Sequence, residues 1–155
     1  MLVARLVTGS AAETRDLGER IGRLLGPGAV VALEGELGAG KTVMAKGLCA
    51  GLGVADERAV ASPTFTIAAR HRGRCTVWHV DAYRLASGRE LEALGAEEIF
   101  EGEAAAVVEW GDRVADALPE DRLVVRLSHE GGDRRAIEIE ARGPRHAEAL
   151  RDFAR

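Results

Sequence analysis

The sequence predicts an α/β fold in which a mixed, partly antiparallel sheet carries helices on both of its faces. In the first half of the chain, apolar segments typical of strands alternate with segments of helical periodicity. In the second half, apolar segments pair across short turns that contain glycine, as the strands of hairpins do. Because alternating strands and helices build parallel sheets and hairpins add antiparallel strands, we expect both kinds of pairing in this protein.

The first elements are a strand at residues 2–8 and a helix that begins after Ser10. Ser10 and Glu13 have the spacing of a capping box, and apolar residues at helical spacing follow. The sequence Gly26–Gly28, with a central proline, ends this helix. The next segment, Ala29–Leu33, is a continuous apolar run, which is typical of a buried parallel strand.

The remaining elements follow from the same two periodicities. Further strands are expected at residues 65–70, 75–80, 104–110, 122–128 and 136–141. Further helices are expected at residues 41–50, 87–94 and 112–118, and from about residue 145 to the end. Ser87 with Glu90 forms a second capping box, and turns at 71–74 and 131–133 close two hairpins.

Length and composition predict one domain spanning residues 1–155. The chain is long enough to bury a core, and its apolar fraction of 46% and charged fraction of 30% are ordinary for a globular protein. It contains no apolar run of membrane-spanning length and no leader pattern after Met1, so a cytoplasmic protein without membrane contact is the default expectation. Cys49 and Cys75 belong to no CxxC pair and are expected to be reduced, mostly buried thiols.

The charge balance argues against a protein that binds nucleic acid alone. The net charge is −4, whereas such domains usually carry a basic patch. The chain has no Asn and no Gln, and only two lysines, Lys41 and Lys46. A lysine that falls within a motif is therefore seldom there by chance.

One of these lysines lies in a glycine-rich loop between a predicted strand and a predicted helix. Residues Gly35–Thr42 read GELGAGKT and match the phosphate-binding pattern GxxxxGK[ST]. Lys41 is expected to reach the β- and γ-phosphates of a nucleotide, and the Thr42 hydroxyl to bind Mg²⁺. The loop backbone would cradle the phosphates through Glu36, Leu37, Gly38, Ala39 and Gly40. The motif places the chain in the P-loop class of nucleotide-binding proteins.

A P-loop also needs a carboxylate at the end of a neighbouring strand to hold Mg²⁺, and a group that positions the attacking water. Asp81 ends the apolar segment TVWHVD, and Glu109 ends AAAVVE. Both are predicted to serve the metal site. The spacing leaves open which of them meets the metal and which the water.

Three further residues are weaker candidates. Thr64, in Ser62-Pro63-Thr64, is expected either to act as a switch-loop threonine that meets Mg²⁺ or the γ-phosphate, or to lie in a plain turn. Arg84 could stabilise the transition state or form a surface ion pair. Trp110 could be a core residue or an exposed stacking surface.

Five segments together resemble the TsaE family, the small bacterial ATPases of tRNA threonylcarbamoyladenosine biosynthesis. They have the order and spacing of that family, and the resemblance runs from about Leu17 to Ile139. The segments are GELGAGKT, SPTFTI (62–67), HVDAYRL (79–85), ELEALG (90–95) and VVEW (107–110). Phe65 stands where Tyr is commoner and Glu36 where Asp is common, and neither change removes a phosphate or metal ligand.

The resemblance implies an α/β P-loop NTPase fold that binds ATP with Mg²⁺ and hydrolyses ATP slowly to ADP, stimulated by partner proteins. It implies action with TsaD and TsaB, the pair that transfers a threonylcarbamoyl group to the adenosine beside the anticodon. Contact with tRNA would be only indirect, through that complex, which agrees with the acidic charge.

The resemblance also implies roles for individual residues. Lys41 and Thr42 would hold phosphate and metal, and Asp81 and Glu109 would serve the metal and catalysis. Thr64 would belong to a switch-like loop that ATP binding orders and hydrolysis releases. An arginine of the last hairpin would contact the nucleotide; Arg135 fits best, although Arg134 is adjacent.

Three other interpretations compete with this one. A small GTPase would need Asn-Lys-x-Asp to recognise guanine, and the chain contains no Asn. A small-metabolite kinase would need a mobile arginine-rich lid, for which Arg70, Arg72 and Arg74 are the candidates. A module that binds ATP without hydrolysing it would differ from the ATPase only in turnover.

Overall fold

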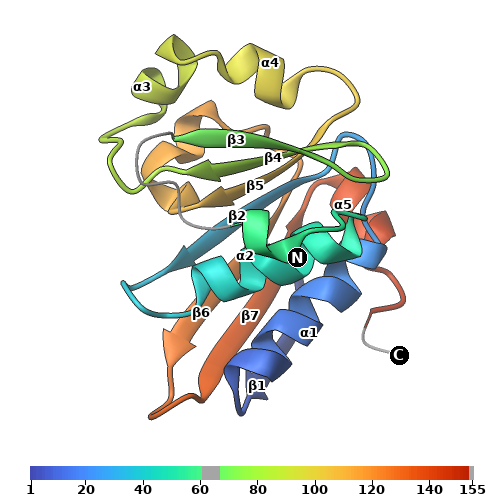
Figure 1. Cartoon of the computed structure of the whole chain (residues 1–155), viewed down its shortest axis with the longest axis vertical. Helices are drawn as coiled ribbons and strands as arrows, with labels where there is room; N and C mark the ends of the chain where they lie inside the picture. The colour runs from blue at the N-terminus through green and yellow to red at the C-terminus, as the bar shows by residue number, and fades with distance from the viewer. Residues whose placement is uncertain (61–66, 154–155) are drawn as a thin grey trace.

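The structure is a computed structural model that describes residues 1–60 and 67–153. Its strands are β1 (Leu2–Thr8), β2 (Val30–Gly35), β3 (Ala68–Arg72), β4 (Thr76–Asp81), β5 (Ala105–Glu109), β6 (Arg122–His129) and β7 (Arg135–Arg142). Within the described part of the chain they form one seven-stranded sheet in the order β1-β7-β6-β2-β5-β4-β3 (Figure 1). The four central strands, β6, β2, β5 and β4, are parallel to one another. β7 pairs antiparallel with β6, β1 pairs antiparallel with β7, and β3 pairs antiparallel with β4. The predicted mixed sheet is confirmed.

Helices cover both faces of this sheet, as the sequence predicts. The helices are α1 (Ala11–Arg23), α2 (Lys41–Gly51), α3 (Gly88–Ala93), α4 (Ala96–Phe100) and α5 (Pro144–Ala149), with short 3₁₀ helices η1 (Glu57–Ala59) and η2 (Gly111–Ala117). α1 and α2 contribute to one hydrophobic cluster, and α3, α4 and η2 contribute to a second cluster on the other face. None of the helices in the described ranges is long and apolar enough to cross a membrane.

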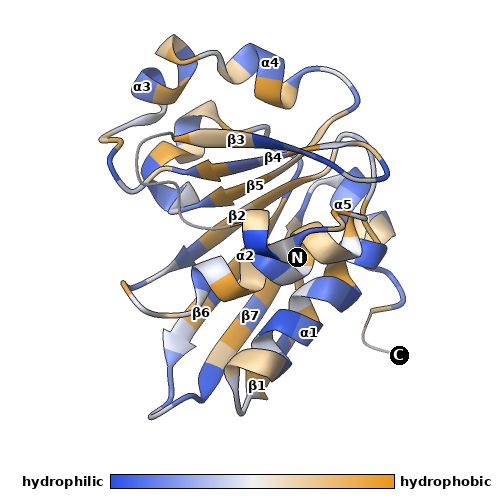
Figure 2. Cartoon of the chain, viewed as in Figure 1, coloured by the Kyte–Doolittle hydropathy of each residue, from blue (hydrophilic) through white to orange (hydrophobic). Residues whose placement is uncertain are grey.

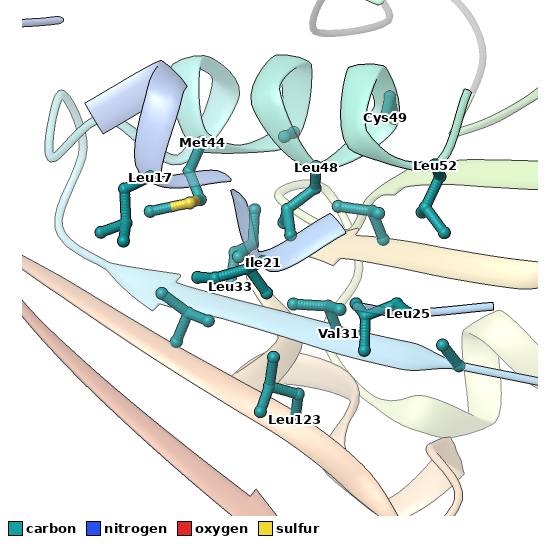
Figure 3. Close-up of a cluster of buried hydrophobic side chains, with 14 of the residues drawn as sticks. Leu17, Ile21, Leu25, Val31, Leu33, Met44, Leu48, Cys49, Leu52 and Leu123 are labelled. Carbon is teal, nitrogen blue, oxygen red and sulfur yellow. The ribbon is translucent and has the colours of Figure 1, made fainter. Parts of the chain in front are cut away.

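The larger cluster fixes α2 against the centre of the sheet. Figure 3 shows Met44 and Leu48 of α2 and Leu17 and Ile21 of α1 packed together above Leu33 of β2. Apolar residues concentrate on the central strands, whereas the outer side of α1 is hydrophilic (Figure 2). The burial of these side chains is the main favourable term that holds the layers together.

Glycines let α1 and α2 approach unusually closely. A Cβ atom at Gly47 of α2 would lie 2.0 Å from the carbonyl oxygen of Arg15, and one at Gly18 of α1 would lie 2.6 Å from that of Met44. Any larger residue at these positions would push the helices apart. Because α2 carries the loop lysine and threonine, this contact also fixes where those side chains lie.

Several local predictions need correction. The Ser87 side chain makes no capping hydrogen bond to α3, and the Glu90 carboxylate accepts a hydrogen bond from the Ala86 N–H at 2.9 Å. The Ser10 cap of α1 is confirmed, since its hydroxyl accepts from the Glu13 N–H at 3.1 Å.

The element boundaries also differ in places. The strand predicted at residues 65–70 is observed as β3, which extends to Arg72 and shortens the hairpin turn. α4 was not predicted, the helical segment after β5 is 3₁₀, and the final helix ends at Ala149. Both cysteines are free thiols as expected; Cys49 is buried, and Cys75 is only half-buried.

Candidate nucleotide site

The glycine-rich loop lies where the carboxyl end of β2 meets the amino end of α2. Gly35 and Gly40 have φ angles of 151° and 102°, a region that side chains rarely tolerate. A Cβ atom at Gly35 would also lie 2.4 Å from the Leu127 carbonyl oxygen of the neighbouring strand. The loop therefore requires glycine at both ends, and it directs the N-terminus of α2 toward any anion bound there. Leu37 is 75% exposed, so a contact between its side chain and a phosphate in the loop is not expected.

Lys41 is turned onto its own loop. Its ammonium donates hydrogen bonds to the carbonyl oxygens of Gly35 and Glu36, each at 2.7 Å, and lies 3.9 Å from the centre of the Trp110 ring. Burial lowers the pKa of Lys41, and the negative charges of Glu109, Asp112 and Asp81 oppose that shift. A phosphate in the loop would offer this cation a stronger partner than two neutral carbonyls.

The two candidate carboxylates end neighbouring parallel strands. Asp81 of β4 lies opposite Glu109 of β5 in the register of the sheet, and Glu109 also lies opposite Leu33 of β2. Parallel strands bring their carboxyl ends to one edge, which is why residues so far apart in sequence meet at the loop.

Glu109, rather than Asp81, contacts the loop threonine. The Thr42 hydroxyl donates to Glu109 Oε1 at 2.7 Å, and Glu109 is 2% exposed. Asp81 is half-buried and accepts a hydrogen bond from the Tyr83 N–H at 3.0 Å. The geometry therefore separates two residues that the sequence treats alike.

The donor set at this edge fits Mg²⁺. Thr42 and Glu109 provide two oxygens within hydrogen-bond distance of each other, and Asp81 lies one strand away. In the described ranges, no group of three or more His, Cys, Asp or Glu residues could hold a metal ion by itself. A cation here would need phosphate oxygens and water as further ligands, which is how Mg²⁺ is usually bound beside nucleotides.

Arg135, the first residue of β7, binds the backbone of the loop. In the strand order, β7 and β5, which carries Glu109, lie on opposite sides of β2. The Arg135 guanidinium donates to the Ala39 carbonyl oxygen at 3.1 Å and to the Gly38 carbonyl oxygen at 3.2 Å. Of the two arginines that the sequence offers, Arg135 thus lies on the loop. A small cavity of about 40 Å³ beside it is lined by Ala11, Thr14, Gly40, Val43, Asp133 and Arg135.

Trp110 follows Glu109 and forms part of an aromatic and cationic stack. Its φ angle of 58° is the only positive one among non-glycine residues of the described chain. The half-buried ring lies 5.1 Å from the Tyr83 ring, and the Arg113 guanidinium lies 4.9 Å from the Trp110 ring and 5.1 Å from the Tyr83 ring. Trp110 is therefore neither a plain core residue nor an isolated surface residue.

Three other residues were candidates in the sequence. Thr64 lies outside the described residues. Arg84 is exposed. Arg74 donates to the carbonyl oxygen of Leu25 at 2.8 Å and to that of Gly51, so it binds the C-terminal ends of α1 and α2. It lies at the opposite end of α2 from the loop, where it cannot act as a lid over phosphates.

His79 is a site residue that sequence reasoning missed. Its Nε2 lies 2.5 Å from Glu109 Oε2, and the ring is completely buried. The indication in the sequence was the His-x-Asp spacing, because residues two apart on a strand face the same side of the sheet.

Comparison with known proteins gives a consistent result. The family model described as "Threonylcarbamoyl adenosine biosynthesis protein TsaE" matches residues 8–137. The tRNA threonylcarbamoyladenosine biosynthesis protein TsaE of Treponema pallidum is 47% identical over 123 residues, which are 79% of this chain and 90% of that protein. The protein of the same name from Bacillus subtilis is 38% identical over 144 residues, covering 92% of this chain and 89% of that protein.

A solved structure is similar over nearly the whole length. The crystal structure of YdiB from Bacillus subtilis superposes with a TM-score of 0.81 at 30% sequence identity. The match covers 99% of this chain and 96% of that chain. The order of strands and helices described above is therefore that of a solved relative.

Proposed function

The chain belongs to the TsaE family of threonylcarbamoyl adenosine biosynthesis proteins, and on this premise we propose that it is an Mg²⁺-dependent ATPase that assists TsaD and TsaB. Its relatives act in the biosynthesis of threonylcarbamoyladenosine in tRNA. ATP hydrolysis and the two partner proteins are the parts of the proposal that go beyond family membership. The reaction would take place in the cytoplasm.

The observation that carries the proposal is the contact between Thr42 and Glu109 beside the loop lysine. It joins a hydroxyl of the phosphate loop to a buried carboxylate at 2.7 Å. With Lys41 it forms the combination that nucleotide hydrolysis needs: a cation for the phosphates and oxygens for a metal ion. A glycine-rich turn with a structural role only would not need a buried carboxylate at this place.

Each residue has a definite task in this mechanism. Lys41 would leave the carbonyl oxygens of Gly35 and Glu36 and bind the β- and γ-phosphates. Thr42 and Glu109 would hold Mg²⁺, which supplies charge neutralisation between these phosphates when it is bound. Asp81, one strand away, would accept a hydrogen bond from the attacking water and orient it. Arg135 would keep the loop in place through the carbonyl oxygens of Gly38 and Ala39.

Partner binding would couple to the state of this loop. The net charge of −4 favours action through proteins over direct binding of RNA. We infer that the nucleotide bound in the loop controls contact with TsaD and TsaB, and that hydrolysis ends that contact.

The test is a pull-down with TsaD and TsaB in ATP, in ADP and without nucleotide, together with a phosphate-release assay. Lys41→Ala is expected to abolish nucleotide-dependent capture and turnover. Lys46→Ala is the matched control, because Lys46 is the other lysine of the chain and lies on the same helix outside the loop. Equal capture in all three nucleotide states would contradict the proposal.

The same assay separates the rival functions. Nucleotide-dependent capture without phosphate release would favour a module that binds ATP without hydrolysing it. Transfer of phosphate to a small metabolite would indicate a kinase, against which the position of Arg74 at the far end of α2 already argues.

A further inference from the structure

The buried pair of His79 and Glu109 is not explained by phosphate or metal binding. We propose that His79 is a positioning residue that holds one oxygen of Glu109, so that the other oxygen stays directed toward Thr42 and the loop. The inference rests on the proposed function, because it assigns His79 to the same site.

The two oxygens of Glu109 have partners on different elements. Oε1 accepts the hydroxyl of Thr42 from α2 at 2.7 Å, and Oε2 lies 2.5 Å from His79 Nε2 of β4. A carboxylate with one partner can still rotate about its last side-chain bond. Two partners from separate rigid elements define the plane of the carboxylate and the direction of each oxygen.

A carboxylate that holds Mg²⁺ is ionised and only accepts hydrogen bonds, so in that state Nε2 of His79 would be the donor. The other ring nitrogen, Nδ1, is buried and has no hydrogen-bond partner among the residues that the structure describes. This arrangement costs free energy that a leucine at the same position would not. A histidine at this position is better explained by what it does to Glu109 than by packing.

His79 would matter most after the nucleotide arrives. With Thr42 among the residues that would hold Mg²⁺, Glu109 Oε1 would lose its present donor, the Thr42 hydroxyl. His79 still holds Oε2, so Oε1 keeps its direction toward the loop. Without His79 the carboxylate could turn away, and partners that orient metal-binding carboxylates typically change metal affinity or activity by about 10- to 100-fold.

The experiment compares three variants. His79→Leu keeps a similar volume and removes the donor, whereas His79→Gln retains an N–H donor at the end of the side chain. His71→Leu is the matched control: His71 lies on the adjacent strand β3, and its buried Nε2 likewise lacks a hydrogen-bond partner within the described ranges. Each variant is measured for ATP turnover, for ADP binding by calorimetry with and without Mg²⁺, and for thermal unfolding.

We expect His79→Leu to lower kcat by about 10- to 100-fold and to weaken the Mg²⁺-dependent part of ADP binding. ADP binding without Mg²⁺ should be unchanged. His79→Gln should recover much of the loss, and His71→Leu should match the parent protein in turnover and ADP binding.

Two results would overturn the assignment. Unchanged kcat and Mg²⁺ response in His79→Leu would show that Glu109 needs no such support. Equal loss in the Leu and Gln variants, with ADP binding also lost without Mg²⁺, would show a role in folding only. If the parent protein itself fails to hydrolyse ATP, the proposed function fails, while the Mg²⁺-dependent part of ADP binding still tests His79.

Discussion

Two completely buried histidines each contact a carboxylate, and the two carboxylates, Glu109 and Asp121, lie toward opposite ends of strand β2. His79 of β4 contacts Glu109 beside the loop, and its Nδ1 has no partner among the described residues. At the amino end, His146 Nδ1 lies 2.6 Å from Asp121 Oδ1, and its Nε2 accepts the Val30 N–H at 3.0 Å. Asp121 also accepts the backbone N–H groups of Arg145 and His146.

The difference lies in how completely the polar atoms are paired. In the His146 cluster both ring nitrogens are bound, and the cluster ties α5 to the first residue of β2. A buried polar network satisfied in this way stabilises one arrangement of the chain. The His79 cluster leaves a nitrogen unpaired and directs a carboxylate and a lysine to the edge of the sheet, where a ligand can complete them. A buried polar group without a partner calls for an explanation, and at His79 the contact with Glu109 beside the loop supplies one.

The largest expected effect separates the two carboxylates by function. Glu109→Gln keeps the shape of the side chain and removes the charge needed at the metal. ATP turnover should fall about 10³-fold, equivalent to about 4 kcal/mol of transition-state stabilisation. Asp121→Asn, the matched change at the other end of β2, should leave turnover unchanged and lower only the free energy of unfolding. Phosphate release and urea unfolding of both variants check this, and an active Glu109→Gln enzyme would remove the distinction.

The next largest effect is on stability and concerns the His146 cluster at the amino end of β2. His146→Leu leaves the buried Val30 N–H without an acceptor, and it leaves Asp121 with only its backbone donors. The free energy of unfolding should fall by about 2 kcal/mol, with kcat of the folded protein unchanged. His129→Leu, at an exposed histidine, is the control and should have little effect. Urea unfolding provides the measurement; a loss of ATP turnover in folded His146→Leu would contradict a purely structural role.

The smallest effect is the dependence of stability on pH. Burial lowers the pKa of His146 below its ordinary value of 6.5, and this outweighs the opposing hydrogen bond and charge of Asp121. Burial likewise lowers the pKa of His71, with a further contribution from His79. Folding therefore favours the neutral rings. Their contribution to stability is complete above pH 6.5 and is lost as the pH falls through 6.5 toward the lower folded-state pKa values.

Urea unfolding at a series of pH values checks this sign. The free energy of unfolding should decrease on acidification below pH 6.5 in the parent protein and less steeply in His146→Leu, where the contribution of His71 remains. Burial raises the pKa of Asp121, but the hydrogen bonds from His146 and the backbone outweigh it, so the net pKa lies below 3.8. The contribution of Asp121 is therefore lost only in stronger acid. An unchanged slope in His146→Leu would contradict the assignment.

Much of this protein could be predicted from local sequence, because the features concerned depend on residues that are close along the chain. The loop Gly35–Thr42 combines its glycines, lysine and threonine within eight positions, and the central strands are continuous apolar runs. The α4 helix was missed because five residues carry too little periodicity to detect. The Ser87 cap was wrong although its spacing to Glu90 equals that of Ser10 to Glu13, so the spacing alone does not decide whether the hydroxyl binds the helix.

The tertiary structure alone decided which side chains meet. Asp81 and Glu109 look alike in the sequence, since each ends an apolar strand, but only Glu109 lies on Thr42 because β5 is the direct neighbour of β2. Arg135 faces the loop through the register of β7, and His79 reaches Glu109 through that of β4. Strand order and register are set by long-range packing of the whole sheet, so neither follows from the spacing of residues along the chain.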